Sequence, residues 1–84
     1  MKKSSKKPHR IKGEVDWKAV GRRIRELRGF DITQKEFAER VSISQNYLST
    51  IEHGKVQMGS EVLLRISRTF GRSMEWLLTG VDRL

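Results

Sequence analysis

Residues 32–55 read ITQKEFAERVSISQNYLSTIEHGK, and this stretch holds the start and stop signals of two short helices. Thr33 and Glu36 form a capping box, the pattern in which a threonine hydroxyl accepts a backbone N–H three residues later. Apolar side chains then follow at helical spacing as far as Val41. The pattern predicts a first helix over residues 34–41.

The second helix of this stretch is predicted over residues 45–53. Ser44 stands at the N-cap position, and Gly54 supplies the residue that can end the helix with a positive φ. Only Leu48 and Ile51 are plain core anchors. A polar outer face on so short a helix indicates a surface that reads another molecule. The side chains expected to face outward are Gln45, Asn46, Ser49, Thr50, Glu52 and His53.

Three more helices are predicted around this pair. Apolar residues recur at intervals of three and four over residues 16–28. Ser60 is expected to cap a helix over residues 61–70, and Ser73 one over residues 74–79. No alternating strand pattern or repeat is present. The predicted fold class is therefore all-α, with five short helices.

The two central helices, joined by a turn of about three residues, have the geometry of a helix-turn-helix unit. Here the chain resembles the lambdoid phage repressor and Cro family, the xenobiotic-response-element class of bacterial regulators. Residues 73–80 look like that family's fifth helix, and the likeness extends over residues 16–80. It rests on a small Ala38 at the helix crossing, on Val41, Leu48 and Ile51 as anchors, and on the ending Glu52-x-Gly54-Lys55.

This resemblance implies a repressor-like DNA-binding domain over residues 14–84, acting as a transcriptional regulator of the repressor kind. One departure is Ser42, at a turn position where the family commonly has glycine. If this residue is left-handed, a serine there costs about 1 kcal/mol.

The resemblance also assigns roles to side chains. The second helix of the unit would enter the major groove, with Gln45 and Asn46 as the strongest candidates for reading adenine, although either could be an ordinary solvated amide. The candidate base contacts are Ser44, Gln45, Asn46, Ser49 and Thr50. The candidate phosphate contacts are Gln34, Arg22, Arg23, Arg25, Tyr47, His53 and Lys55.

Two of these roles carry details of their own. Gln34 resembles the family's phosphate-contacting glutamine, which also braces the residue corresponding to Gln45. Tyr47 either reaches a phosphate through its hydroxyl or lies half buried. For any one arginine, a solvated face is the alternative to a phosphate contact.

Relatives usually bind two-fold sites as dimers, so the resemblance implies a homodimer with reading helices about 34 Å apart. The residues that could form the contact, or that could instead only close the core, are Met74, Leu77, Leu78, Val81 and Leu84.

The net charge of +8 is unevenly distributed along the 84 residues. Residues 1–13 hold six basic side chains and no acid, whereas residues 14–84 carry only +2. With little to bury, residues 1–13 are predicted to be a disordered arm that follows phosphates, or else a solubilising tail. Its basic residues are Lys2, Lys3, Lys6, Lys7, Arg10 and Lys12.

The same sequence argues against several other functions. The chain has no cysteine, and its two histidines have no related spacing, so we expect neither an enzyme nor a metal or cofactor site. No apolar run could span a membrane, and we expect a cytoplasmic protein without a small-molecule ligand. The alternative to DNA binding is a protein-interaction module on the same fold, such as an antitoxin or a bridging coactivator.

Overall fold

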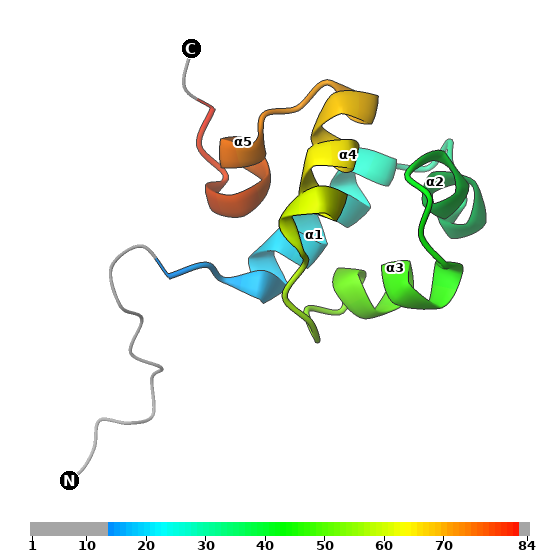
Figure 1. Cartoon of the computed structure of the whole chain (residues 1–84), viewed down its shortest axis with the longest axis horizontal. Helices are drawn as coiled ribbons and strands as arrows, with labels where there is room; N and C mark the ends of the chain where they lie inside the picture. Colours follow the sequence, from blue (N-terminus) through cyan, green and yellow to red (C-terminus); the bar gives the residue numbers. More distant parts are fainter. Residues whose placement is uncertain (1–13, 83–84) are drawn as a thin grey trace, which may run out of the picture.

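The computed structural model of the chain describes residues 14–82, which contain α-helices and no strand. The helices are α1 (Trp17–Arg28), α2 (Gln34–Arg40), α3 (Gln45–Glu52), α4 (Ser60–Phe70) and α5 (Met74–Thr79). In Figure 1, α5 lies on the opposite side of α1 and α4 from α2 and α3. The predicted all-α class with five helices is confirmed. In the part of the chain so described, every helix is too short or too polar to cross a membrane.

Three of the predicted caps begin helices as expected. The hydroxyls of Thr33, Ser44 and Ser73 accept backbone N–H groups three residues later, at 3.1, 3.0 and 3.0 Å. The predicted limits of the first three helices are each one residue too long. Asp16, Val41 and His53 stand at cap positions, with backbone angles outside the helical range.

The predicted cap of α4 is wrong. Gly59 is the N-cap residue, with an extended backbone and no side chain to accept a hydrogen bond, and Ser60 is the first residue of the helix. The prediction followed residue type, because serine is a favoured cap, but glycine also tolerates this position. The first turn of α4 therefore lacks a side-chain cap.

The core lies where the helices meet, and one aromatic pair joins α2 to α4. The rings of Phe37 and Phe70 stack with centroids 4.5 Å apart. Arg65 of α4 donates through Nε to the carbonyl oxygen of Val41 at 2.8 Å, which satisfies a carbonyl at the end of α2. The buried apolar residues are Val20, Ile24, Phe37, Ala38, Val41, Leu48, Ile51, Met58, Leu63, Ile66 and Leu77.

The turn between α2 and α3 contains a residue that has a positive φ although it is not a glycine, the one such residue among residues 14–82. Ser42 has φ 59°, in the left-handed region, so the strain expected for serine at this position is present. The turn is nevertheless tied to α2, because the N–H of Ile43 donates to the carbonyl oxygen of Ala38 at 3.0 Å. The tie fixes how α3 leaves α2.

The crossing of α1 and α3 depends on a glycine. Gly21 is buried, and a Cβ at this position would run into the carbonyl oxygens of Ile51 and Glu52 on α3. Both of these oxygens are backbone atoms, which cannot move aside as a flexible side chain can. Glycine therefore sets how closely α1 approaches α3.

We predict that Gly21→Ala destabilises the fold by about 1–3 kcal/mol, because the added methyl group must push two helix backbones apart. Urea unfolding followed by tryptophan fluorescence measures the loss. The control is Gly59→Ser, whose Cβ meets nothing within 4 Å and whose hydroxyl suits an N-cap. Equal stability of Gly21→Ala and the wild type would contradict the account of the crossing.

Candidate functional site

The outer face of α3 begins with two exposed amides. Gln45 and Asn46 are both exposed on the first turn, as predicted, whereas Ser49 and Thr50 are partly buried one turn later. The hydroxyl of Ser44 already accepts from the N–H of Tyr47. The hydroxyl of Thr50 donates to the carbonyl oxygen of Asn46 at 2.9 Å. Gln45 and Asn46 therefore have side chains that the backbone of α3 does not occupy.

Glu52 does not face outward, and this prediction is wrong. Its exposed fraction is 4%, and among residues 14–82 it is the one charged residue that is buried. Leu48, Ile51 and Glu52 stand at positions i, i+3 and i+4 of α3, which share one helix face. Glutamate was assigned to the surface because it is charged, although its position places it with the apolar residues that face α1.

Side chains from three helices meet at the Glu52 carboxylate. Arg28 of α1 donates to it twice, through Nε to Oε2 at 2.8 Å and through Nη2 to Oε1 at 2.9 Å. Gln34 of α2 donates through Nε2 to Oε1 at 3.0 Å. Arg25 lies further off, with Nε 3.8 Å from Oε1 and 55% of its side chain exposed. We call Glu52, Arg28 and Gln34 the carboxylate cluster.

The carboxylate cluster determines which way the Gln34 amide points. A carboxylate only accepts hydrogen bonds, so the NH2 group of Gln34 must face Glu52 and its carbonyl oxygen must face away. That oxygen accepts from Nε2 of Gln45 at 3.4 Å. The chain of bonds therefore runs from the core to the exposed outer face of α3, and Gln34 braces Gln45.

Opposing effects act on the pKa of Glu52. Burial of the carboxylate raises its pKa, but the hydrogen bonds from Arg28 and Gln34, together with the charges of Arg28 and Arg25, lower it more. The pKa of Glu52 ends below its ordinary value, and the hydrogen bond to Glu52 raises the pKa of Arg28. Glu52 is thus held ionised inside the protein.

Among the other predicted phosphate contacts, Arg23 has a use inside the protein. Its Nη1 donates to the carbonyl oxygen of Leu77 at 2.9 Å, which ties α1 to α5. His53 donates through Nδ1 to the carbonyl oxygen of Ser49 at 2.7 Å, since a carbonyl only accepts. Tyr47 is partly buried and packs against the core.

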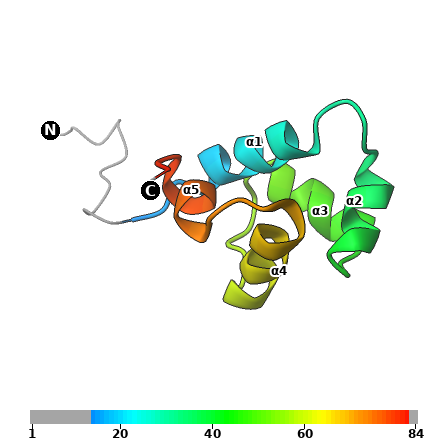
Figure 2. The same ribbon diagram turned by 90° about the horizontal axis from the view of Figure 1, so that it is seen from above.

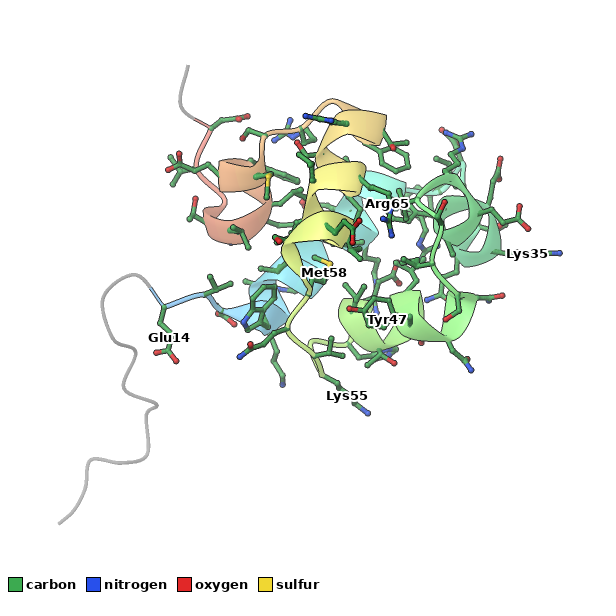
Figure 3. All side chains as sticks on the ribbon, viewed as in Figure 1. Glu14, Lys35, Tyr47, Lys55, Met58 and Arg65 are labelled. Carbon is green, nitrogen blue, oxygen red and sulfur yellow. The ribbon has the colours of Figure 1, made fainter. Side chains whose placement is uncertain are left out.

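The remaining candidates come from the end of α3 and from α1. Lys55 is exposed and projects away from the protein just beyond α3 (Figure 3). Arg22 and Arg25 are exposed on α1, and Arg25 reaches the carboxylate cluster. The basic arm, residues 1–13, lies outside the described residues.

Sequence reasoning missed Arg28 as well as Glu52. Arginine on a helix usually lies at the surface, yet only 18% of the Arg28 side chain is exposed. The helical spacing of Glu52 from Leu48 was a sufficient signal for its burial. Arg28 likewise stands four residues after Ile24 and seven after Gly21, on the buried face of α1. Its pairing with Glu52 had no such signal, because it depends on how α1 packs across α3.

Five short helices with a tight α2–α3 turn and an amide-bearing α3 define a repressor-type helix-turn-helix domain. The sequence profile described as the helix-turn-helix domain matches residues 21–83, so the chain belongs to the helix-turn-helix domain family. The resemblance to lambdoid repressors and to xenobiotic-response-element regulators is confirmed. No curated protein matches the sequence.

Several solved structures are similar to the chain. The P22 c2 repressor in complex with a synthetic operator is 30% identical, with a TM-score of 0.69 over 74% of this chain and 96% of the repressor. The clp gene regulator ClgR of Corynebacterium glutamicum is 31% identical, with a TM-score of 0.65 over 71% of this chain and 65% of ClgR.

SinR, the master regulator for biofilm formation, in complex with DNA, is 27% identical, with a TM-score of 0.63 over 69% of this chain and 95% of SinR. Members of the family are transcription regulators, so the prediction that the chain is not an enzyme is confirmed.

We predict that stability depends on pH through Glu52. Its pKa is lower in the folded than in the unfolded chain, where it is about 4.3. The stabilisation is therefore complete above that value and is lost as pH falls through the lower folded pKa. In urea unfolding from pH 7 to pH 2.5, Glu52→Gln should be less stable than the wild type at pH 7, and the difference should shrink on acidification.

The control for this prediction is Glu61→Gln. Glu61 is exposed on α4, with 86% of its side chain accessible and Arg65 at 4.0 Å. Its removal should leave the pH dependence of unfolding nearly unchanged. A difference between Glu52→Gln and the wild type that stays constant down to pH 2.5 would contradict the role of the carboxylate.

Proposed function

We propose that the chain is a sequence-specific double-stranded DNA-binding regulator that reads the major groove with α3. The observation that carries the proposal is the exposed Gln45, held by Gln34 from the carboxylate cluster. An amide fixed on a rigid helix is suited to base reading, because less side-chain entropy is lost on binding. The complexes of the P22 c2 repressor with an operator and of SinR with DNA support it.

Gln45 retains the groups that adenine requires. One N–H of its amide is used by Gln34, which leaves the second N–H and the carbonyl oxygen. A bidentate contact to adenine N7 and N6 needs one donor and one acceptor. Asn46, exposed beside it, offers the same donor and acceptor to the neighbouring base pair. We therefore expect adenine at one or two positions of the site.

The backbone contacts we propose lie around this reading face. The first turn of α2 presents free N–H groups next to Gln34, where an anion is favoured. Lys55 extends beyond the end of α3, and Arg25 is exposed at the edge of the carboxylate cluster. These groups position the protein without reading sequence.

We also propose that two copies bind one operator and repress transcription by occupying it. Of the residues suggested for the contact, Leu77 is fully buried in the core, whereas Val81 is 48% exposed. Met74 and Leu78 pack partly against the core, and Leu84 lies outside the described residues. The available surface is therefore the end of α5 and Val81. Such a regulator would act in the cytoplasm, where bacterial or phage DNA lies.

Selection of bound sites from random duplexes tests the function as a whole. The proposal predicts a two-fold symmetric consensus with half-sites about 34 Å apart, one turn of DNA. Failure to enrich any sequence at low salt would contradict it.

We predict that Gln45→Ala weakens binding to the selected site by about 1–3 kcal/mol and leaves binding to random DNA nearly unchanged, because it removes a base contact. Fluorescence anisotropy on both duplexes gives the ratio of affinities. The control is Gln57→Ala, the same truncation at an exposed position between α3 and α4, which should preserve the ratio. An equal loss on both duplexes would remove Gln45 from base reading.

We predict that deletion of residues 1–12 lowers affinity for every duplex and flattens its salt dependence, because six cations are lost. If about four of them engage phosphates, the slope of log K against log salt becomes shallower by about 3–4 per protomer. The slopes of full-length and truncated protein are compared on one duplex. Identical slopes would mean that the arm contributes only solubility.

A further inference from the structure

The loop between α1 and α2 exposes an aromatic side chain that neither the core nor the carboxylate cluster uses. Phe30 is fully exposed, unlike the other large exposed apolar residues of the described chain, Leu64 at 37% and Val81 at 48%. A ring of this size buries 150 Å² or more when it is covered. Residues that bury this much surface are among those that carry most of the binding energy at protein interfaces. A single exposed apolar residue is ordinary, so the surroundings of Phe30 decide its meaning.

The loop that carries Phe30 is anchored at both ends. The N–H of Gly29 donates to the carbonyl oxygen of Arg25 at 3.0 Å, and Gly29 has φ 65°, which turns the chain away from α1. On the other side, Nη1 of Arg28 donates to the carbonyl oxygen of Ile32 at 3.4 Å. Ile32 packs against the core, so the inward position in the loop is filled by Ile32 and Phe30 is held outside.

An open hollow of about 580 Å³ lies beside Phe30, and three of its six lining residues are arginines. Arg28 is neutralised by Glu52 through two hydrogen bonds. Arg25 gives Glu52 only a distant contact, and among residues 14–82 Arg22 forms no ion pair. Glu26 is the acidic residue of the lining. An aromatic ring beside two available guanidinium groups is thus presented to solvent as one surface.

We propose that Phe30, Arg22 and Arg25 form a docking site for an acidic segment of another protein, with an apolar side chain seated on Phe30 and carboxylates on the two arginines. Charge complementarity selects this partner, since the lining is cationic and its apolar element is a protruding ring. Aromatic residues and arginine are the types that carry most of the binding energy at protein interfaces. The site goes beyond the proposed DNA binding and shares Arg25 with the backbone contacts proposed above, so its test is made at Phe30 and Arg22.

The location of the docking site keeps it apart from the proposed dimer surface. Figure 2 shows the α1–α2 connection at one edge of the molecule, at the far end of α1 from α5. Figure 1 likewise places α5 on the opposite side of α1 and α4 from α2. A partner on Phe30 therefore leaves the end of α5 free. It would still lie against Arg25 and Arg28, next to the carboxylate cluster, where it can influence α3.

The test is a selection of random 12-residue peptides, displayed on phage, against the full-length protein. The selected peptides are then titrated against the wild type, Phe30→Ser, Arg22→Ser and the control Leu64→Ser. We expect a consensus with one apolar residue among Asp and Glu. The dissociation constant should rise about tenfold or more in Phe30→Ser and severalfold in Arg22→Ser, and should stay unchanged in Leu64→Ser.

Three results would overturn the proposal. In the first, the selection yields no consensus, a consensus without acidic residues, or peptides that bind Phe30→Ser as well as the wild type. In the second, Phe30→Ser loses as much affinity for duplex DNA as Gln45→Ala, which would make Phe30 a DNA contact. In the third, sedimentation shows that Phe30→Ser abolishes self-association, which would make the partner a second copy. Because Phe30 lies outside the core, its variant should keep the wild-type unfolding curve, which is the control for folding.

Discussion

The ionised carboxylate of Glu52, buried at the crossing of α1, α2 and α3, is the constraint on which the rest of the structure depends. A buried charge is costly unless its oxygens are satisfied, and here Arg28 and Gln34 supply three hydrogen bonds. Because these partners come from different helices, the charge is satisfied only when all three helices are in place. Apolar contacts tolerate small shifts, whereas the bidentate geometry of Arg28 does not.

This arrangement links stability to the proposed reading surface. Gln34 is oriented by Glu52 on one side and braces Gln45 on the other. The position of the exposed Gln45 amide is therefore set by the core. Gly21 contributes by allowing the backbones of α1 and α3 to approach at the residues next to this charge. The polar side chains of α3 are therefore presented by a rigid support rather than by a flexible surface, as a binding site requires.

Much of the fold could be predicted from the sequence because its signals are local. The caps at Thr33, Ser44 and Ser73 each depend on a few neighbouring residues, and those helices begin where expected. The cap of α4 was misplaced because the side chain of Ser60 is suited to an N-cap, whereas Gly59 takes that position through its extended backbone alone.

The burial of Glu52 was within reach of helical spacing, but its bonds to Arg28 and Gln34 were not. They join residues 24 and 18 positions apart and exist only once the helices have packed. Likewise, Phe30 is exposed because Ile32 takes the inward position in the loop. The apolar pattern alone does not tell which of these two side chains packs against the core. The family resemblance did supply the contact between Gln34 and Gln45, and the structure contains it.

The most direct measurement of the central claim is a double-mutant cycle between Arg28 and Glu52, read as the free energy of unfolding in urea. The variants are Arg28→Met, Glu52→Leu and the double variant, with Arg40 and Glu36 as an exposed reference pair on α2 at 3.5 Å. Removal of either buried partner should cost about 3–5 kcal/mol, and replacement of both by apolar residues should cost much less than the sum. The reference pair should couple by no more than about 0.5 kcal/mol. Losses that simply add at Arg28 and Glu52 would contradict the claim that the buried carboxylate holds the three helices together.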